Sequence, residues 1–402
     1  MNKFKIGIIR EEKNPPDKRV AITPEKCKYI LENYENIDIF VQPSNIRNFS
    51  DEEYKKNNIT LKEDLSDCDL LLGVKEVPID KLIPNKKYMF FSHTIKLQAH
   101  NKKLLKEIIN KKITMIDYEV ITDKSNRRLI AFGKYAGIVG SYNAFLTTGK
   151  KLKSFAIKPA HQCFDMKELK KELVKVQLPE NFKIVTTGDG RVASGCLEIL
   201  ETLKIKKVSP KEFLENTFTE PVYTQLKSKD MYGHKNNMEW NTEHFYNNPT
   251  EYTSLFKKYT KIADLYIACH FWNPKSDRLF NLTDIKENDF NIKVIADISC
   301  DINGAVPTTI RPSTISDPIY GFDKNNLIET NFEDPNAIAI MAIDNLPCEL
   351  PRDSSEDFSN QFIKNVLPNF FNNDPDKIIE RATITENGFL KQGYKYMESM
   401  LE

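Results

Sequence analysis

The sequence predicts an α/β protein built from two doubly wound, Rossmann-like domains with mainly parallel sheets. Short runs rich in β-branched residues alternate along the chain with amphipathic stretches, which is the pattern of parallel α/β folds. A glycine-rich turn at residues 188–195 directly follows one of these runs and leads into a helical stretch. The chain has 402 residues, more than one hydrophobic core usually serves, so two domains are expected.

Strand and helix signals alternate through the first part of the chain. Strands are predicted at residues 5–10, 37–41, 69–75, 88–93 and 113–118. A helix is predicted to begin at Pro24, with Thr23 as its N-cap and the proline in its first turn. A second helix is predicted over residues 97–110. This order is typical of a parallel sheet whose strands are joined by helices.

The second part of the chain repeats this alternation. A stretch of small residues at 135–141 is predicted to open a helix leading into the second domain. Strands are predicted at residues 182–187, 265–268, 294–296 and 338–343, with a helix from Ala193 to Lys204. Residues 216–259 are polar and aromatic without clear periodicity, and we interpret them as an ordered insertion. After Pro351 the pattern becomes helical, and we expect these residues to pack on the first domain.

The composition excludes several classes of partner. The chain has 58 basic and 57 acidic residues, so it lacks the electrostatic footprint of a nucleic-acid or anionic-membrane binder. No apolar stretch reaches the roughly 18 residues of a membrane span, and the N-terminus lacks a signal-peptide core. The seven cysteines are widely spaced without a CxxC pair, which argues against a zinc site and a disulfide framework. We expect a cytoplasmic protein without a bound metal.

The turn at residues 188–195 predicts a dinucleotide site, because it combines a strand, spaced glycines and a helix. Gly188 would permit the tight turn, and Gly190 would let the backbone approach a pyrophosphate. Ala193 or Gly195 would allow close packing of the helix on a strand. The remaining expected cofactor-binding residues of the turn are Asp189, Arg191 and Val192.

The sequence leaves the choice between NAD and NADP open. An acidic residue that binds the adenosine ribose is expected about twenty positions after the turn. Lys206-Lys207-Val208-Ser209-Pro210-Lys211 occupies that place, and Ser209 is the candidate contact there. Without a carboxylate the usual argument for NAD is missing, while the nearby lysines suit a 2′-phosphate.

Polar side chains follow several predicted strands of the first domain. They are Lys13 and Arg19 after the first strand, then Lys75, Glu76, His93, Lys96, Asp117, Glu119 and Arg128. Because the carboxyl ends of parallel strands meet at one edge of a sheet, these side chains form a candidate site. His93 is a candidate for proton transfer, and a partly desolvated Lys75 can orient or protonate a carbonyl oxygen. Arg19 and Arg128 suit bidentate carboxylate binding.

At these residues the chain resembles the L-lysine-forming saccharopine dehydrogenases and the lysine–ketoglutarate reductase domains of bifunctional lysine-degradation enzymes, relatives of alanine dehydrogenase. The matching segments span nearly the whole chain in order. They are residues 8–13 and 19–24, 73–78, 91–96, 116–119, 128–137, 296–301, 344–347 and 350–352. The Phe-Ser-His-Thr-Ile-Lys segment at 91–96 is specific to the saccharopine branch rather than the alanine branch.

The resemblance implies a reversible reaction in which saccharopine, oxidised nicotinamide and water give L-lysine and 2-oxoglutarate. It implies that Lys75 and His93 are the acid–base groups. The other implied substrate contacts are Glu76 and Glu119, which tune those groups or meet the lysine ammonium, and the basic residues Lys13, Arg19, Lys96 and Arg128. The implied contacts on the nicotinamide side are Asp301, Asn345 and Leu346.

The resemblance also implies a discontinuous first domain, residues 1–135 with about 350–402, which carries the catalytic groups. Residues 136–349 would form the dinucleotide domain, and the active site would lie in the cleft between the domains.

Two other interpretations are open. One is an alanine-dehydrogenase-like enzyme that takes a small oxo acid and ammonia, against which Lys96 and Arg128 favour a larger, more anionic product. The other is a non-catalytic dinucleotide-binding relative, against which the pair Lys75 and His93 speaks.

Overall fold

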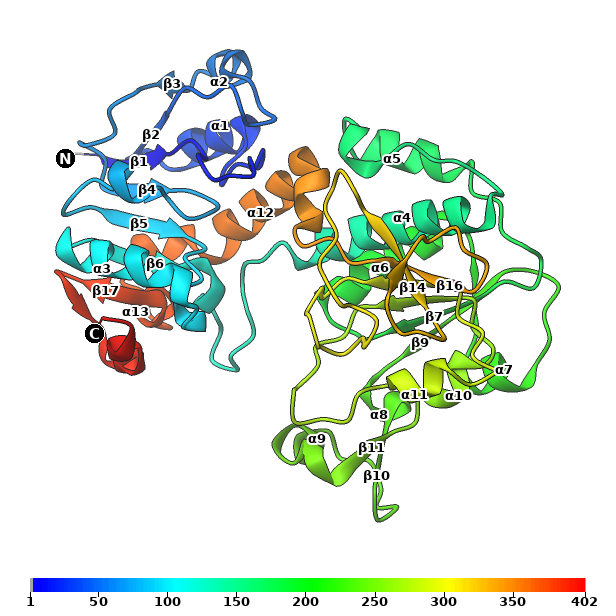
Figure 1. Ribbon diagram of the computed structural model, residues 1–402. Coiled ribbons are helices and arrows are strands. Elements are labelled where there is room, and N and C mark those ends of the chain that lie inside the picture. Colours follow the sequence, from blue (N-terminus) through cyan, green and yellow to red (C-terminus); the bar gives the residue numbers. More distant parts are fainter. Residues whose placement is uncertain (1–2, 402) are drawn as a thin grey trace. The chain divides into compact units, whose positions relative to one another are not determined.

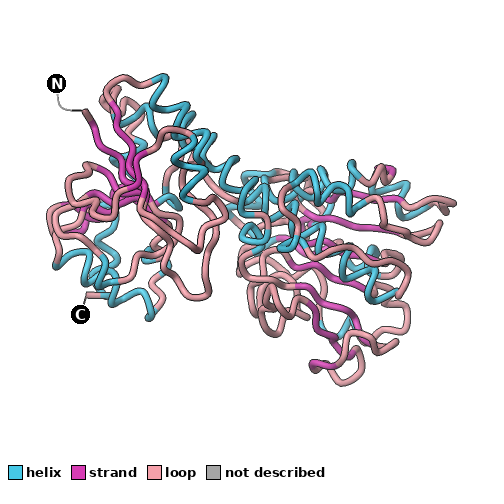
Figure 2. The backbone as a smooth tube through the Cα atoms, turned by 90° about the horizontal axis from the view of Figure 1, so that it is seen from above, coloured by secondary structure: helices cyan, strands magenta, loops and turns pink. Residues whose placement is uncertain are grey.

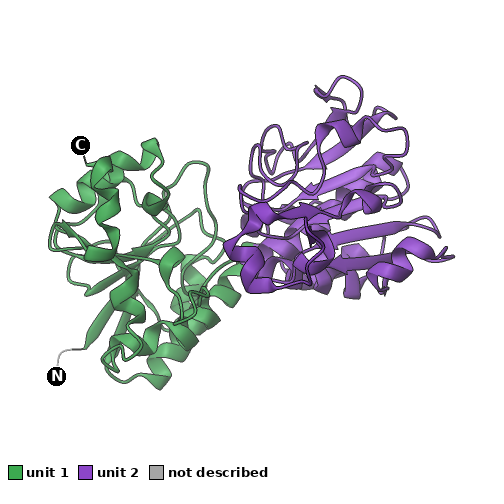
Figure 3. Cartoon of the chain, turned by 90° about the horizontal axis from the view of Figure 1, so that it is seen from below, with its two compact units in different colours: residues 1–132, 351–402 green, residues 133–350 purple. Residues whose placement is uncertain are grey.

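The computed structural model describes residues 3–401, and the chain divides into two compact units. Unit 1 comprises Met1–Phe132 with Pro351–Glu402, and unit 2 comprises Gly133–Leu350 (Figure 3). Each unit contains one eight-stranded sheet, so the predicted α/β class with mostly parallel sheets is confirmed. Among the described residues, no helix combines the length and apolarity needed to cross a bilayer.

The sheet of unit 1 has the strand order β18-β17-β6-β5-β4-β1-β2-β3 (Figure 1). Its strands are β1 (Phe4–Ile8), β2 (Ile37–Val41), β3 (Thr60–Leu61), β4 (Leu70–Leu72), β5 (Lys87–Phe90), β6 (Thr114–Asp117), β17 (Thr383–Glu386) and β18 (Phe389–Leu390). The first six strands pair in parallel, while β17 runs antiparallel to both β6 and β18. The parallel strands therefore end at one edge, where the candidate catalytic residues follow them.

Helices cover this sheet, and they include the returning C-terminal segment. They are α1 (Pro24–Asn33), α2 (Asp51–Lys56), η1 (Ile79–Lys81), η2 (Thr94–Lys96), η3 (Ala99–Asn101), α3 (Lys102–Asn110), η4 (Tyr118–Val120), α12 (Pro351–Asn365), η8 (Leu367–Phe370), α13 (Ile378–Ala382) and η9 (Gln392–Met400). Helix α12 joins the N-terminal segment through hydrogen bonds, because the Ser355 and Ser359 hydroxyls accept the N–H groups of Val20 and Thr23.

Thr23 occupies the predicted N-cap position of α1, but its side chain does not cap the helix. Its hydroxyl instead donates to Glu356 Oε2 at 2.7 Å, on α12. The Thr23 side chain is therefore bonded to α12 rather than to the first turn of α1.

Two strands end earlier than predicted, and this moves the candidate catalytic residues into loops. Strand β4 ends at Leu72 and β5 at Phe90, so Lys75 and His93 lie beyond the sheet. His93 has a φ of 54°, in the left-handed region, which no residue of a strand adopts. Leu97, with a φ of 55°, also lies in the left-handed region. Helix α3 begins at Lys102, not at residue 97 as predicted.

The sheet of unit 2 has the strand order β15-β14-β16-β13-β12-β7-β9-β8 (Figure 2 shows its strands in magenta). Its strands are β7 (Lys183–Thr187), β8 (Lys206–Lys207), β9 (Val222–Leu226), β12 (Leu265–Ala268), β13 (Val294–Asp297), β14 (Ile319–Asp323), β15 (Glu329–Thr330) and β16 (Ala337–Met341). Only β14 and β15 run antiparallel to their neighbours. A separate hairpin pairs β10 (Tyr232–His234) with β11 (Tyr252–Ser254) inside the predicted insertion.

The helices of unit 2 complete the alternating pattern. They are α4 (Gly133–Leu152), η5 (Ala160–Gln162), α5 (Met166–Leu173), α6 (Arg191–Thr202), α7 (Pro210–Glu215), α8 (Ser228–Met231), α9 (Thr242–Asn247), η6 (Pro249–Glu251), α10 (Lys257–Thr260), α11 (Leu282–Ile285) and η7 (Leu346–Glu349). Buried side chains of α4 and α6 share one hydrophobic cluster with strands β7, β12, β13 and β16.

Helices α4 and α6 cross with their backbones in contact, because both carry glycine at the crossing. A Cβ added at Gly137 would lie 1.9 Å from the carbonyl oxygen of Val192, and one added at Gly195 would lie 2.0 Å from that of Lys134. Gly195 was expected to allow packing on a strand. The structure corrects this expectation, because the close neighbour of Gly195 is another helix. The crossing sets the position of α6, whose first turn belongs to the predicted dinucleotide site.

We predict that Gly195→Ala lowers the free energy of unfolding by about 3 kcal/mol, because the added methyl group overlaps rigid backbone. Gly190→Ala is the matched control, since a Cβ there meets nothing within 4 Å and its φ of −85° suits alanine. Urea unfolding at equilibrium measures both. Equal stability of the two variants would contradict the backbone contact.

Candidate active site

A buried carboxyl group shapes the loop that carries Lys75. Glu11 accepts the N–H groups of Val74 at 2.5 Å and Lys75 at 2.9 Å. The loop after β4 is therefore held to the loop after β1, although 63 and 64 positions separate the partners. Burial lowers the pKa of the Lys75 ammonium, and the nearby charges of Arg19 and Lys13 lower it further. A lysine in this state can give and take a proton nearer to neutrality than a solvated one.

The carboxylate of Glu76 joins two of the predicted site residues. One oxygen pairs with Nδ1 of His93, and the other accepts from Lys13 Nζ at 3.0 Å. Burial acts to raise the pKa of Glu76, but the hydrogen bond and charge of His93 and the Lys13 contact outweigh it and hold that pKa at about 2. Because Glu76 engages Nδ1, Nε2 of His93 is the ring nitrogen available for proton exchange.

Asp117 locks the ends of β5 and β6 together. Its carboxylate is fully buried and accepts the N–H of Ser92 at 3.0 Å, the Ser92 hydroxyl and the N–H of Glu119 at 2.7 Å. These bonds fix Ser92, which directly precedes the left-handed His93, and the start of η4. The Asn101 amide adds a hydrogen bond of 3.1 Å to the carbonyl of His93. These hydrogen bonds hold the backbone at Ser92 and His93 and so help to orient the imidazole ring.

Glu119 gathers two further basic residues of the predicted site. Its Oε1 lies 2.6 Å from Arg128 Nη2 and 3.5 Å from Lys96 Nζ. Its Oε2 is buried and, within residues 3–401, has no hydrogen-bond partner. Burial opposes ionisation, but the charges of Arg128 and Lys96 lower the pKa of Glu119, so this oxygen is a charged acceptor. An orphaned carboxylate oxygen of this kind suits an ammonium group of a ligand.

Arg19 is placed differently from the other basic residues. It is 2% exposed, forms a two-bond pair with Asp17 at 3.0 and 2.6 Å, and stacks over the ring of Phe132. The carboxylate that Arg19 binds in this structure is therefore that of Asp17. Its predicted contact with a substrate carboxylate stays a prediction.

The structure thus joins Lys13, Glu76 and His93 in one network of ion pairs. A second network joins Lys96, Glu119 and Arg128. The sequence analysis did not single out Glu11 or Ser92. Glu11 binds the backbone of a loop 63 and 64 positions away, and the Ser92 hydroxyl donates to the Asp117 side chain 25 positions away, so no local pattern marks either residue. Both networks of ion pairs lie in unit 1, whereas the predicted cofactor residues lie in unit 2.

The glycine-rich turn of unit 2 has the predicted strand–turn–helix geometry. Gly188 has a φ of 94°, and a Cβ there would lie 2.8 Å from the carbonyl oxygen of Cys269. Asp189 and Gly190 follow, and Arg191 and Val192 begin α6. The open space around Gly190 permits close approach of a phosphate to the N–H groups at the start of α6.

The remaining predicted cofactor residues follow other strands of the same sheet. Asp301 lies in the loop after β13, while Asn345 and the buried Leu346 lie after β16, at the start of η7. Because β7, β13 and β16 are parallel, all these residues lie beyond their carboxyl ends. Ligands of open α/β sheets bind at that edge.

On the side of the sheet that ends in β8, the strand next to β7 is β9. The ribose contact was expected near β8, which does not pair with β7. Sequence spacing pointed to residues 206–211, but β8 is the edge strand there and Ser209 serves as the N-cap of α7. Strand β9 pairs along the whole of β7, and Gly188 N–H donates to Leu226 O at 2.8 Å. Gln225 Nε2 donates to Gly188 O at 2.9 Å, and Gln225 Oε1 accepts from Lys207 Nζ at 3.0 Å. The strand end next to the glycine-rich turn is therefore at Gln225 to Lys227, where no acidic residue stands.

The chain shares its fold with an alanine dehydrogenase and a transhydrogenase. The structure superposes on an L-alanine dehydrogenase with a TM-score of 0.65, at 14% identity, covering 99% of this chain and 100% of that one. A transhydrogenase from Sinorhizobium meliloti gives a TM-score of 0.60 at 12% identity, covering 96% and 100%. Residues 7–139 match the alanine dehydrogenase/PNT N-terminal domain family.

Two kinds of curated relative are similar over most of the chain. Alpha-aminoadipic semialdehyde synthase of Arabidopsis thaliana is 28% identical over 98% of this chain and 41% of its own length, and that of Bos taurus is 28% identical over 100% and 48%. A saccharopine dehydrogenase (NAD+, L-lysine-forming) of Emericella nidulans is 26% identical over 89% of this chain and 90% of its own length. The resemblance identified from the sequence is confirmed: the chain is a relative of these proteins, and it spans about half of the synthases' length.

The buried Glu11 predicts a pH dependence of stability. Burial, with the charge of Asp17 adding to it, raises the pKa of Glu11 from 4.5 to about 8, so between these values the folded protein holds a proton that the unfolded chain has lost. The free energy of unfolding should therefore fall by a few kcal/mol (~3–5) as pH rises from about 4.5 to about 8, and then level off.

Glu11→Gln should flatten this slope, whereas Glu12→Gln, at an exposed neighbour, should keep it. Urea unfolding at about pH 5.5, 7 and 8.5 measures the slopes. Parallel slopes in all three proteins would contradict the assignment.

Proposed function

We propose that this chain is a saccharopine dehydrogenase of the L-lysine-forming type, or lysine–2-oxoglutarate reductase, that prefers NADP. The observation that carries the proposal is a desolvated Lys75 that directly precedes Glu76, the residue that orients His93, with the Glu119–Arg128 pair near the same histidine. The similarity to saccharopine dehydrogenases and aminoadipic semialdehyde synthases supports the substrate class.

The proposed reaction couples a condensation to a reduction. The ε-amine of lysine adds to the keto carbon of 2-oxoglutarate, and loss of water gives an imine. The reduced nicotinamide, when bound, supplies the hydride that converts this imine to the secondary amine of saccharopine. The balance is lysine, 2-oxoglutarate, NADPH and a proton giving saccharopine, NADP+ and water.

The protein residues move the protons of this sequence. Lys75 protonates the keto oxygen as the C–N bond forms, because its lowered pKa makes proton donation facile. His93 Nε2 takes a proton from the amine nitrogen and returns it to the oxygen that leaves as water. Glu76 stabilises the imidazolium through Nδ1 and so acts as a positioning residue.

The charged groups around these two residues match the ends of the substrates. Arg128 and Lys96 are the proposed carboxylate contacts, and Lys13 and Arg19 extend the basic surroundings of Lys75. The orphaned Oε2 of Glu119 would accept a substrate ammonium. Saccharopine carries three carboxylates and two amines, so a site with basic groups flanking a carboxylate complements it.

The proposed preference for NADP rests on the end of β9. A carboxylate at this position binds the ribose hydroxyls of NAD and repels a 2′-phosphate. Here the position holds neutral Gln225, bonded to Lys207, and the exposed Lys227 two residues later. Two ammonium groups beside an uncharged amide favour the extra phosphate of NADP.

Oxidation of reduced nicotinamide tests the substrate. We expect NADPH absorbance to fall with L-lysine plus 2-oxoglutarate, and not with pyruvate plus ammonium. Turnover with pyruvate and ammonium alone would replace the proposal with an alanine-dehydrogenase-type activity. Binding of NADPH without turnover on either pair would make the chain a non-catalytic relative.

Substitution of the two acid–base groups tests the mechanism. Lys75→Met and His93→Gln should each lower kcat by about 10²–10⁴-fold while the Kd for NADPH stays within about twofold. Exposed Lys103→Met and His100→Gln are matched controls that should keep the parent kcat. Unchanged kcat in both site variants would refute the assignment.

Substitution at the end of β9 tests the cofactor preference. Lys227→Ala should raise the KM for NADPH about tenfold, which corresponds to about 1.4 kcal/mol, and leave the KM for NADH unchanged. The exposed Lys229 supplies the control, Lys229→Ala, which should change neither constant. A wild-type enzyme that uses NADH better than NADPH would contradict this part of the proposal.

A further inference from the structure

A polar pocket in unit 1 joins the predicted substrate residues to the C-terminal segment. It has a volume of about 620 Å³, within the roughly 300–1,000 Å³ of small-molecule sites. One wall contains Glu119, Thr122 and Arg128, from η4 and the loop that follows it. The other wall contains Arg381, in α13, and Tyr394, in η9, whose hydroxyl donates to the Arg381 carbonyl oxygen at 2.6 Å. The C-terminal segment therefore forms one wall of a pocket, in addition to packing on the first domain.

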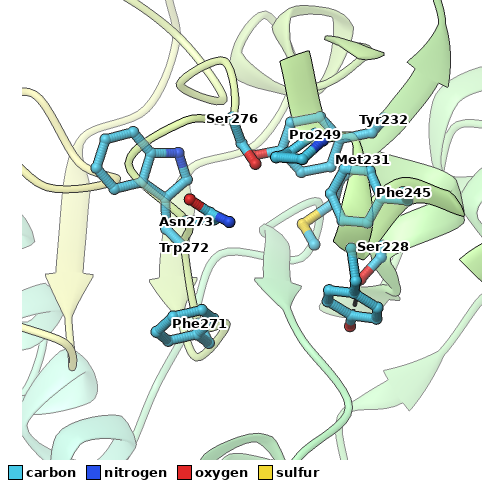
Figure 4. A pocket seen from close by; sticks show the side chains of 10 residues that line it. Ser228, Met231, Tyr232, Phe245, Pro249, Phe271, Trp272, Asn273 and Ser276 are labelled. Atoms are coloured by element: carbon cyan, nitrogen blue, oxygen red, sulfur yellow. Dashed lines mark hydrogen bonds between the residues drawn. The ribbon is translucent and has the colours of Figure 1, made fainter. Parts of the chain in front are cut away.

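A pocket of unit 2 has no comparable room. Its walls include Met231 and Phe245 from the insertion, and Phe271 and Trp272 from the loop after β12 (Figure 4). Its volume of about 40 Å³ holds no more than about three water molecules. This pocket is therefore too small for an organic substrate, whereas the pocket of unit 1 is large enough.

Backbone pairing holds the two walls of the unit 1 pocket together. Strand β17 pairs with β6, so the C-terminal segment, red in Figure 1, adjoins η4, which directly follows β6. Thr122 forms an isolated antiparallel bridge with Arg128, and Arg381 Nη2 donates to the carbonyl oxygen of Thr122 at 2.8 Å. The two arginines, one from each wall, are therefore both tied to Thr122.

The guanidinium of Arg381 is fixed in place without a carboxylate partner. Its Nη1 donates to the carbonyl oxygen of Asp376 at 2.5 Å, and its Nη2 to that of Thr122. Within residues 3–401 it forms no ion pair, whereas Lys391 of the same wall pairs with Glu386 at 3.0 Å. Most of its N–H donors remain available to a ligand. Such a group suits a carboxylate of a ligand.

Glu119 supplies the opposite charge from the other wall. Its side chain is 10% exposed, and its Oε2 is the buried oxygen that lacks a hydrogen-bond partner within the described chain. Its Oε1 is already engaged by Arg128 and Lys96. An acceptor for a cation and a guanidinium for an anion thus line the same pocket. An α-amino acid presents this pair of charges, because its ammonium and its carboxylate are bonded to the same carbon atom.

We propose that this pocket binds the α-amino-acid end of the substrate, with Glu119 receiving the α-ammonium and Arg381 the α-carboxylate. The inference rests on the proposed function. In that reaction the pocket takes the lysine end, because 2-oxoglutarate has a keto group in place of the α-ammonium. The lysine side chain then extends from Glu119 toward His93, since Lys96, which lies 3.5 Å from Glu119, belongs to the turn directly after His93. Arg381 becomes a specificity-determining residue supplied by the C-terminal segment.

Substitution of Arg381 tests the subsite in the active enzyme. Arg381→Gln should raise the KM for L-lysine about 10–30-fold and leave kcat and the KM for 2-oxoglutarate within about twofold, because uniform binding of one substrate is lost. Arg381→Lys keeps the charge without the planar fork and should recover part of the loss. Arg127, which pairs with Asp123 at 2.8 Å, supplies the matched control. Arg127→Gln should keep every constant of the parent.

Binding of substrate analogues to the whole chain tests the subsite without turnover. NADP+ and 2-oxoglutarate are present, so no hydride donor is available. L-Norleucine keeps the α-ammonium and the α-carboxylate and lacks the ε-amine, whereas 6-aminohexanoate lacks the α-ammonium and cadaverine lacks the α-carboxylate. By calorimetric titration the parent protein should bind L-norleucine at least about tenfold more tightly than either of the others. This comparison needs no variant, so it holds even if Arg381→Gln lowers the stability of the fold.

The outcomes separate this inference from the proposed function. Selective binding of L-norleucine without turnover of lysine and 2-oxoglutarate would remove the proposed function and support the subsite. An active enzyme in which Arg381→Gln leaves the KM for L-lysine unchanged overturns the subsite and keeps the proposed function. Failure of the parent to bind L-norleucine, or equal affinity for cadaverine, overturns the subsite whether or not the enzyme is active.

Discussion

The contact between the backbones of α4 and α6 is the constraint on which the predicted dinucleotide site depends. Helices that carry side chains at their crossing stay about 8–10 Å apart. Glycines at positions 137 and 195 remove the Cβ atoms and allow carbonyl oxygens of the partner helix into the space those atoms would fill. The first turn of α6 is thereby held against the backbone of α4, and the space around Gly190, the N-cap of α6, is open. Gly188 completes the arrangement, because the loop after β12 passes where its side chain would be.

Buried carboxylates have the corresponding role in unit 1. Strands β4, β5 and β6 are short, so the residues that follow them are not held by the sheet itself. Glu11 and Asp117 accept backbone N–H groups of neighbouring loops and replace the missing ladder bonds. These buried acidic residues therefore orient the loops through hydrogen bonds to backbone N–H groups.

The sequence by itself determined the α/β class, the strand at residues 37–41 to the residue, the glycine-rich turn and the set of polar residues beyond the strand ends. These features are encoded locally, by alternation of apolar residues and by glycine spacing, and are therefore visible in one chain segment at a time. Only the tertiary structure decided that β9 rather than β8 lies beside β7, so that the strand end next to the glycine-rich turn is at Gln225 to Lys227. It also decided that Arg19 pairs with Asp17, that Gly195 meets a helix, and that Glu11 holds the Lys75 loop. Each of these facts joins residues through space by packing or hydrogen bonds of the folded chain, and a pattern within one segment carries no information about which partner will arrive.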